Sequence, residues 1–355
     1  MLPPERSHRI VIVTDAWYPQ VNGVVRTLSM VADELRAMGH VVEVVGPERF
    51  RTIPCPSYPD IPLSVLPRRR LIRIIEAFAP DAMHIATEGP LGIAARRWAR
   101  RNELSFTTSF HTRFAEYIKA RTGLPVGPIY AWMRRFHGAA EGTMVATESL
   151  RAELTERGFH RVLPWSRAVD LELFRPLPRD AWDGLRRPVF LYVGRVAVEK
   201  NIEAFLSLDL PGSKVVVGGG PQLEPLRRAY PGVVFTGPRF GAALAGAYAG
   251  ADVFVFPSKT DTFGLVLLEA LACGTPIAAF PVTGPKDVVA MAAYPIGAID
   301  WNLRSAALRA LAVDRAACRA HAERYSWRAC TETFLGHLVL LDGSYHPGTG
   351  RPGNA

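Results

Sequence analysis

Short apolar runs alternate with longer amphipathic stretches along most of the chain. The first run, Arg9–Thr14, reads RIVIVT and is typical of a strand buried in a parallel sheet. The pattern then predicts a helix over Val25–Met38, ended by Gly39, and a second strand over His40–Val45. This order of strand, helix and strand predicts a βαβ unit. The glycine-containing loop after its first strand lies where open α/β sheets bind ligands.

The same alternation continues in two successive series. Further strands of the first series are predicted at Ala82–Ile85, Ser105–Thr108 and Thr143–Ala146. A proline-rich connector, Phe174–Pro178, separates them from a second series, whose strands are predicted at Val189–Gly194, Lys214–Val217, Val233–Phe235, Val253–Phe256 and Ile277–Phe280. Helical stretches intervene in both. The fold class expected is therefore α/β, with two Rossmann-like domains facing a central cleft.

Composition agrees with this picture. A chain of 355 residues is long enough for two domains, and 48% hydrophobic with 21% charged residues is usual for a globular enzyme. Met1–Arg6 lacks the apolar core of a signal peptide, and no uncharged apolar run reaches about 18 residues. We expect a cytoplasmic protein without disulfides or structural zinc, because no C-x-x-C pair occurs among its cysteines, which are Cys55, Cys273, Cys318 and Cys330.

The net charge of +9 is concentrated in one part of the chain. Residues 49 to 135 contain 15 lysines and arginines against six acids. A basic surface can attract anionic lipid, nucleic acid or acidic glycan, and a solvated arginine-rich surface is the plainer interpretation. Within this window, 113–137 predicts two short helices that mix cations with apolar side chains. These helices either lie on an anionic membrane or form an ordinary packed pair; their apolar residues are Tyr117, Ile118, Tyr130, Trp132, Met133 and Phe136.

Candidate chemistry is densest in Phe256–Pro276. Asp261 is predicted in a loop and Glu269 in the helix that follows it. Between them lies Phe263-Gly264-Leu265, whose glycine allows a diphosphate to approach the backbone N–H groups at the start of the helix. A carboxylate on each side of that point can bind a sugar and a ribose. The stretch predicts a nucleotide-sugar site.

A second cluster follows the first strand of the second series. Arg195 and Lys200 lie five positions apart in the loop that begins at Gly194. Fixed cations there would stabilise the charge that develops on a departing nucleoside diphosphate. The loop after the next strand contains Gly219 and Gly220, which would let the backbone approach a base or ribose.

Together these motifs resemble those of family 4 glycosyltransferases, which have the GT-B fold. Asp261 and Glu269 match the family's Glu-x7-Glu signature except that the first acid is Asp, and Ser258–Gly264 is similar to GDP-mannose-dependent α-mannosyltransferases and bacterial glycolipid synthases. The resemblance covers roughly residues 8 to 340. It implies an acceptor-side domain at residues 1–174, a nucleotide-sugar domain at 175–325 and a helix crossing back to the first domain at 326–341. The tail, 343–355, contains glycine, proline and asparagine but no core residues, so we expect it to be disordered.

The resemblance also implies roles for individual residues. Arg195 and Lys200 would contact the diphosphate, Glu269 the ribose hydroxyls, and Asp261 the donor sugar. In the first domain, Asn22 and Gly23 match a glycine loop near the donor diphosphate and acceptor, and His111 matches a histidine that contacts the donor sugar. His84 and His137 lack such a context and are expected to be structural.

The implied reaction is transfer of a hexose, with retention of anomeric configuration, to a lipid or glycan acceptor. GDP-mannose is the favoured donor, with a UDP-hexose or UDP-glucuronate as alternatives. We expect no cofactor and no metal, because the chain contains neither Asp-x-Asp nor a His, Cys and acid cluster with ligand spacing. No nucleic-acid partner is expected, and peripheral association with the inner face of the membrane is a further expectation.

Other functions stay open on the sequence. One is a non-catalytic nucleotide-binding or nucleic-acid-binding protein that uses the basic face. Another is a Rossmann oxidoreductase, although Thr14–Trp17 stands where a Gly-x-Gly-x-x-Gly fingerprint would begin. A nucleotide-sugar hydrolase, epimerase or phosphorylase on the same fold is a third.

Overall fold

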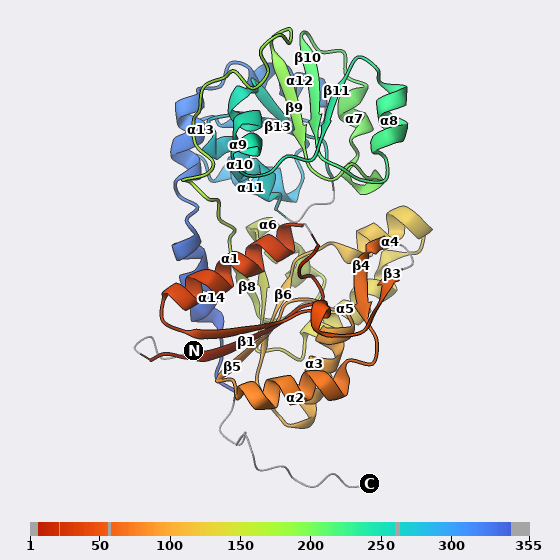
Figure 1. Ribbon diagram of the computed structural model, residues 1–355, viewed down its shortest axis with the longest axis vertical. Coiled ribbons are helices and arrows are strands. Elements are labelled where there is room, and N and C mark those ends of the chain that lie inside the picture. The colour runs from red at the N-terminus through yellow and green to blue at the C-terminus, as the bar shows by residue number, and fades with distance from the viewer. Residues whose placement is uncertain (1–5, 21, 56–57, 260–262, 342–355) are drawn as a thin grey trace. The chain divides into compact units, whose positions relative to one another are not determined.

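The computed structural model describes residues 6–20, 22–55, 58–259 and 263–341, which form two compact units (Figure 1). Unit 1 comprises the described residues within Met1–Ala115, Leu124–Ser166 and Trp327–Ala355. Unit 2 comprises those within Glu116–Gly123 and Arg167–Ser326. The chain thus passes between the units at Ser166, against the boundary at 175 that the proline-rich connector predicts. The predicted tail, 343–355, lies outside the described residues.

Unit 1 is built on a six-stranded sheet in the order β2-β1-β5-β6-β7-β8, with every pairing parallel. The strands are β1 (Arg9–Val13), β2 (Val41–Val45), β5 (Ala82–Ile85), β6 (Thr107–Phe110), β7 (Gly142–Val145) and β8 (Val162–Pro164). Because β2 pairs with one side of β1 and all later strands lie on the other, the order reverses between β1 and β5. That junction is where doubly wound sheets bind ligands.

The helix after β1 shows how local sequence sets its bounds. α1 (Gly23–Ala37) begins where Asn22 Oδ1 accepts hydrogen bonds from the N–H groups of Val24 and Val25, both at 3.0 Å. It ends before Gly39, whose φ of +90° suits glycine. The next helices along the chain are α2 (Arg68–Phe78), α3 (Pro90–Arg101), α4 (Phe114–Thr122), α5 (Val126–His137) and α6 (Glu148–Glu156).

A small antiparallel hairpin, β3 (Thr52–Cys55) with β4 (Tyr58–Ser64), follows the short 3₁₀ helix η1 (Pro47–Arg49). The sequence does not predict this hairpin, since prolines such as Pro54 and Pro62 remove ladder donors. It forms as an isolated pair outside the main sheet, where missing donors are tolerated.

The C-terminal segment completes unit 1, which confirms the predicted helix that crosses back to the first domain. α14 (Trp327–His337) packs with Phe334 against the rings of Trp165 and His84, with centroids 5.0 and 4.9 Å apart. The indole N–H of Trp165 donates to the carbonyl of Cys330 at 3.2 Å. Beyond the helix, the N–H of Leu341 donates to the carbonyl of Asp81 at 2.8 Å.

Unit 2 contains a second parallel six-stranded sheet, in the order β11-β10-β9-β12-β13-β14. This is the strand order 3-2-1-4-5-6 of a Rossmann domain, so the predicted α/β fold of two Rossmann-like units is confirmed. Its strands are β9 (Val189–Val193), β10 (Ser213–Val217), β11 (Val234–Gly237), β12 (Val253–Phe256), β13 (Ile277–Ala279) and β14 (Gly297–Ile299). Its helices from the linker onward are η2 (Val198–Lys200), α7 (Glu203–Leu206), α8 (Leu223–Ala229), α9 (Gly241–Gly250), α10 (Leu265–Ala272), α11 (Thr283–Ala290), α12 (Leu303–Ala310) and α13 (Arg315–Ala322).

Each unit has its own apolar core. In unit 1, Val11, Met83 and Trp98 are among the buried residues between β1, β5 and α3. In unit 2, Phe190, Val255 and Leu303 lie between the sheet and α12. Within the described residues, no helix is long and apolar enough to cross a membrane.

Candidate active site

The predicted donor-binding residues of unit 2 meet at the carboxyl edge of its sheet. β9 and β12 are hydrogen-bonded neighbours, and the strand order reverses between them. The loop after β9 contains Arg195 and Lys200, and the segment after β12 leads to Phe263 and the start of α10. Parallel strands end at the same edge, so the topology brings two sequence motifs about 60 residues apart to the position where such sheets bind ligands.

The loop after β9 is fixed by its neighbours. The N–H of Gly194 donates to Val217 at 3.0 Å, and the N–H of Val196 donates to Gly219 at 2.9 Å. The buried Tyr192 hydroxyl donates to the carbonyl of Arg195 at 2.8 Å. Arg195 and Lys200 are both half-buried, with Lys200 at the end of η2. Two cations therefore extend from a backbone that hydrogen bonds hold in place.

The three glycines after β10 have different surroundings, because Gly218 and Gly220 pack against backbone and Gly219 faces open space. A Cβ on Gly218, where φ is +150°, would lie 1.8 Å from the carbonyl oxygen of Gly194, and one on Gly220 would lie 2.4 Å from that of Val196. These two residues let the loop after β10 pack on the loop after β9. A Cβ on Gly219 would meet nothing closer than Pro238 Cδ at 3.8 Å, so the space beside Gly219 is open.

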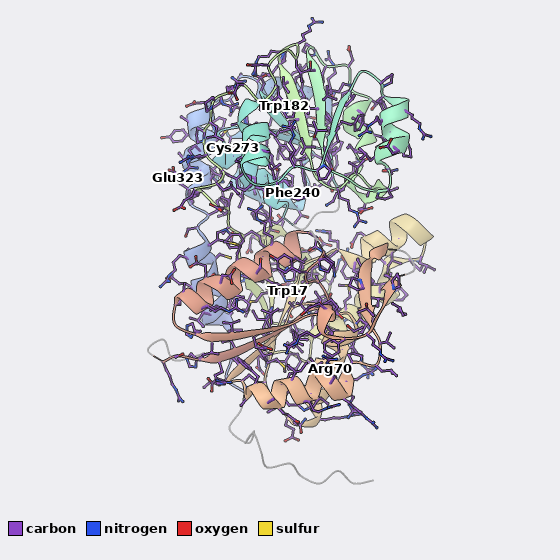
Figure 2. The ribbon with its side chains drawn as sticks, viewed as in Figure 1. Trp17, Arg70, Trp182, Phe240, Cys273 and Glu323 are labelled. Atoms are coloured by element: carbon purple, nitrogen blue, oxygen red, sulfur yellow. The ribbon has the colours of Figure 1, made fainter. Side chains whose placement is uncertain are left out.

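The loop after β11 borders the same edge and was missed by the sequence analysis. Phe240, labelled in Figure 2, precedes α9 and is 63% exposed. The neighbouring Arg239 guanidinium lies 4.5 Å from the centroid of Trp182, which helps to position the loop. An exposed ring here can stack on a planar ligand group. A single phenylalanine in a loop gives no sequence signal for that role.

The N-terminus of α10 is open to an anion. Gly264 is its N-cap, with φ +86°, and no side chain among the described residues caps the helix. The N–H groups of its first turn, beginning at Leu265, can therefore face a phosphate. Phe263 itself is buried against Tyr325, with ring centroids 6.3 Å apart, so its ring belongs to the core. Asp261 lies outside the described residues.

Glu269 is a buried acid in the middle of α10, only 5% exposed. The Tyr248 hydroxyl of α9 donates to its Oε2 at 2.8 Å. This contact meets the expectation that a carboxylate in so apolar a helix must be paired or bind a ligand. Burial, and then the charge of Glu269, raise the pKa of Cys273, the residue directly after α10, to about 12, so this thiol (labelled in Figure 2) stays protonated.

One positioning residue was not assigned a role from the sequence. Asn201 adopts the left-handed conformation, with φ +52°, directly after η2. Its side-chain amide donates to the carbonyl of Pro257 at 3.0 Å, which ties the loop after β9 to the segment after β12. The signal was present, because Asn is the residue that most readily accepts this conformation while offering a donor.

The carboxyl edge of the sheet in unit 1 contains Asn22 and Gly23. The Asn22 carboxamide is already engaged, since its oxygen caps α1 and its nitrogen donates to Gln20 Oε1 at 3.2 Å. Gly23 is the first residue of α1. Gln20 in turn donates to the carbonyl of Asp15 at 3.0 Å, so side-chain amides connect Asn22, Gln20 and Asp15.

Asp15 joins the loop after β1 to the start of α3. It accepts hydrogen bonds from the N–H of Leu91 at 2.8 Å, from the N–H of Gly92 at 3.2 Å and from the Thr87 hydroxyl at 2.9 Å. Burial nevertheless raises its pKa from 3.8 to about 6. Asp15 was not singled out in the sequence because its partners are over 70 positions away.

His111 directly follows β6 and is 9% exposed. Its Nε2 lies 2.8 Å from Ser109 Oγ, and Ser109 Oγ lies 3.0 Å from His84 Nε2. His84 is fully buried, and His137 lies between Thr108 and Glu88, each 3.0 Å from a ring nitrogen. Both thus have the fully hydrogen-bonded surroundings of structural histidines.

The basic helices show a mixed outcome. In α5, Tyr130, Met133 and Phe136 are buried, as in an ordinary packed helix, whereas Trp132 is 41% exposed. The side chain of Tyr117 lies outside the described set. Within the part of the chain that is described, no group of three or more His, Cys, Asp or Glu could hold a metal ion.

Comparison with known proteins identifies the family. Residues 21–173 match the family model described as Glycosyltransferase Family 4, and residues 187–296 match the model described as Glycosyl transferases group 1. A GDP-mannose-dependent alpha-mannosyltransferase from Mycolicibacterium smegmatis is 35% identical over 79% of this chain and 82% of its own length. The chain belongs to the family 4 glycosyltransferases.

Other relatives agree on fold and reaction class. A sulfoquinovosyl transferase from Arabidopsis thaliana is 32% identical over 93% of this chain and 74% of its own length. The solved sucrose-phosphate synthase from Thermosynechococcus elongatus has a TM-score of 0.72 and 21% identity, covering 93% of this chain and 98% of its own, which shows the GT-B fold. The glycosyltransferase assignment excludes the oxidoreductase and non-catalytic alternatives.

The two family matches divide the predicted site residues of this glycosyltransferase between them. Asn22, Gly23 and His111 fall in the first match, and the residues from Gly194 to Glu269 fall in the second. The structure brings the latter group to one edge of unit 2, apart from Asp261. The individual role of each residue remains a prediction.

Proposed function

We propose that this glycosyltransferase moves mannose from GDP-mannose to a lipid or glycan acceptor with retention of configuration and without a metal ion. The observation that supports it most is the carboxyl edge of unit 2, where Arg195, Lys200 and the uncapped N-terminus of α10 occupy neighbouring loops. A diphosphate fits this arrangement because it needs positive charge and N–H donors from more than one side.

The proposed chemistry depends on charge that develops at the leaving group. As the glycosidic bond breaks, the nucleoside diphosphate becomes more negative. Arg195, Lys200 and the α10 N–H groups stabilise that charge more in the transition state than in the ground state. Because the Tyr192 and Val196 hydrogen bonds fix the loop beforehand, little reorganisation is needed. These groups supply the neutralisation that a divalent metal would otherwise provide.

Retention follows from the same site. The departing phosphate takes the proton of the acceptor hydroxyl while the acceptor attacks the oxocarbenium-like sugar on the face that the phosphate leaves. No carboxylate has to act as a nucleophile, so Asp261 and Glu269 are available to bind the donor. NMR of the purified product tests this step, and an inverted anomeric linkage would contradict it.

GDP-mannose is proposed as the donor because the Mycolicibacterium smegmatis relative is a GDP-mannose-dependent alpha-mannosyltransferase. The Arabidopsis thaliana relative is a sulfoquinovosyl transferase, so the relatives of this chain differ in the sugar that they transfer. Purified protein is incubated with radiolabelled GDP-mannose, UDP-glucose, UDP-galactose and UDP-glucuronate, each with EDTA or with Mn²⁺. We expect transfer from GDP-mannose in both conditions. Turnover that EDTA abolishes and Mn²⁺ restores would refute the metal-free proposal.

Site variants locate the activity. Arg195→Gln and Lys200→Gln should each lower kcat by about 100-fold, because one preorganised electrostatic contact contributes that much. Arg228→Gln, an exposed arginine on α8 of the same unit, is the matched control and should keep wild-type turnover. Unchanged turnover in both site variants would remove the proposed diphosphate site.

The acceptor is proposed to be presented at a membrane surface, with the protein bound peripherally to the inner face. Support comes from exposed apolar residues close in sequence to cations, namely Phe114, Leu124 and Trp132, which are 45%, 54% and 41% exposed. The donor assay is repeated with membrane lipid extract and with soluble glycans. Transfer to glycans alone, with no flotation on anionic liposomes, would refute this part.

A further inference from the structure

An open hollow lined mainly by arginine lies in unit 1. Arg96 and Arg100 of α3, Arg135 of α5, and Gly138 and Ala139 beyond α5 enclose a volume of ≈ 410 Å³. A hollow of ≈ 230 Å³ is lined by Arg96, Arg97, Arg100 and Arg101. The two share Arg96 and Arg100, so they adjoin. We call them together the arginine pocket.

The arginine pocket lies at the opposite edge of the unit 1 sheet from His111. α3 begins beyond the carboxyl end of β5 and runs back, so its last turn is near the amino ends of the strands. The segment after α5 is there too, since the N–H of Glu141 donates to the carbonyl of Phe106, just before β6, at 2.9 Å. His111 follows the other end of β6. Glycosyl transfer therefore does not account for this cluster.

The charge of the pocket is not balanced locally. Among the described residues, no carboxylate forms an ion pair with its arginines, although arginines elsewhere are paired, such as Arg113 with Glu153 and Arg187 with Asp252. Arg96 and Arg100, like Arg97 and Arg101, stand one turn apart on α3, where like charges repel. Burial, and then the charges of Arg100, Arg135 and Arg97, lower the pKa of Arg96.

One guanidinium of the pocket is held in place. Arg96 Nε donates to the carbonyl of Phe136 at 2.8 Å, and Nη2 donates to that of Arg135 at 2.6 Å. Its Cζ lies 5.6 Å from the centroid of the Phe136 ring. Arg96 thus forms a fixed wall, while Arg97, Arg100, Arg101 and Arg135 are exposed around it.

The alternative is that these arginines only stabilise helix ends. Arg100 and Arg101 are in the last turn of α3, and Arg135 is in the last turn of α5, where cations interact favourably with the helix dipole. That role explains the position of each cation alone. It does not explain why two helix ends direct their cations to a shared hollow without an acid, and it predicts no ligand.

We propose that the arginine pocket binds a ligand carrying two or more phosphate groups. Guanidinium groups donate bidentate hydrogen bonds to phosphate, and an anion would relieve the repulsion among them. Two adjoining hollows with shared arginines suit more than one phosphate. Such a ligand is either the headgroup phosphates of an anionic membrane or a free polyphosphate, and the experiment separates the two.

The test compares three forms of the full chain. Arg100→Gln with Arg135→Gln removes two charges from the pocket, and Arg186→Gln with Arg228→Gln removes two exposed charges from unit 2. Calorimetry with inorganic tripolyphosphate at low salt should give at least about tenfold weaker binding for the pocket variant than for wild type and control. Any tripolyphosphate bound at the donor site is common to all three and cancels. Equal binding in all three would overturn the proposal.

Thermal unfolding distinguishes loss of a binding site from loss of helix-end stabilisation. Relief of like-charge repulsion should leave the Tm of the pocket variant at or above that of the control, and tripolyphosphate should raise the Tm of wild type and control more than that of the pocket variant. A pocket variant with a lowered Tm, and no tripolyphosphate effect on any form, would assign the arginines to helix-end stabilisation and overturn the proposal.

Flotation then identifies the source of the phosphate. Vesicles of phosphatidylcholine with and without phosphatidylglycerol are compared for the same three proteins. Flotation that needs phosphatidylglycerol and is lost only in the pocket variant supports the proposal with lipid as the source. Tripolyphosphate binding with equal flotation supports it with a free polyphosphate as the source. Binding of duplex DNA without binding of tripolyphosphate would replace the proposal with a nucleic-acid surface.

Discussion

Asp15 offers a quantitative test of how unit 1 is held together. It lies in the loop after β1 and is buried against the first turn of α3. Its carboxylate accepts hydrogen bonds from the N–H groups of Leu91 and Gly92 and from the Thr87 hydroxyl. Burial outweighs these hydrogen bonds and raises its pKa from 3.8 to about 6. The folded protein therefore binds a proton at Asp15 more tightly than the unfolded chain does.

This difference sets the size and sign of a pH effect on stability. A rise of about 2 units, at about 1.4 kcal/mol each, is worth about 3 kcal/mol. Asp15 is neutral in both states below the unfolded value of 3.8, so the favourable contribution is fully present there. It is lost as the pH rises through about 6, where the folded protein must also ionise the buried carboxyl.

The assay compares wild type with Asp15→Asn by urea unfolding over pH 4 to 7. Asn keeps an acceptor but does not ionise. Relative to the variant, the free energy of unfolding of wild type should fall by about 2 kcal/mol across this range, because part of the full effect is already lost by pH 4. Asp33→Asn, in which the exposed partner of Arg36 is changed, serves as the control for other titrating groups. A difference between wild type and Asp15→Asn that stays constant with pH would refute the reasoning.

Three further predictions concern unit 2. Gly218→Ala should lower the Tm by several degrees, because its Cβ would lie 1.8 Å from Gly194 O, whereas Gly219→Ala, with 3.8 Å to its nearest atom, should lower it far less; equal Tm values would contradict the loop packing. Tyr248→Phe should cost about 1–3 kcal/mol in urea unfolding, because it removes a donor from buried Glu269. Asn201→Ala should disorder the loop after β9 and raise KM for the donor, because it removes the contact with Pro257. Asn201→Asp keeps the turn conformation but lacks the N–H donor, so it should raise KM by the same amount. Wild-type kinetics in both variants would exclude a role for the Pro257 contact.

Continuous apolar runs made most strands predictable. β9 and β12 are buried along their whole length, and β1 is buried after its exposed first residue, Arg9; the buried positions form continuous runs of aliphatic and aromatic residues. β6 was predicted over Ser105–Thr108 but extends over Thr107–Phe110, because its buried Thr107, Thr108 and Ser109 are hydrogen-bonded to residues of other strands and helices. A hydrophobicity pattern does not predict a strand of polar residues whose hydrogen-bond partners come close only in the folded protein. β8 and β14, of three residues each, were not predicted, because Pro164 and Gly297 leave only two apolar residues in a row in each strand.

The candidate site divides in the same way. Arg195, Lys200 and Glu269 could be proposed from the sequence because their spacing follows motifs that are each local to one strand and the segment after it, and their roles stay predictions. The roles of Gly218 and Gly220 were not, since a glycine reads the same whether it faces a ligand or, as the structure has it, the backbone of the neighbouring loop. Phe240 and Asn201 depend on which strands are neighbours, and that information is topological.

In both units a polar side chain joins two loops at the point where the strand order of the sheet reverses. In each sheet the order reverses between two neighbouring strands, β1 with β5 and β9 with β12, and the loops beyond them diverge toward helices on different faces. Left alone, such loops would fray, because their backbone groups have lost the ladder partners of the sheet. In unit 1 the Asp15 carboxylate joins the loop after β1 to the start of α3, and in unit 2 the Asn201 amide joins the loop after β9 to Pro257. A short polar side chain at the point of reversal therefore joins the loops at each edge before any ligand arrives, and such preorganisation is what the proposed stabilisation of a departing diphosphate requires.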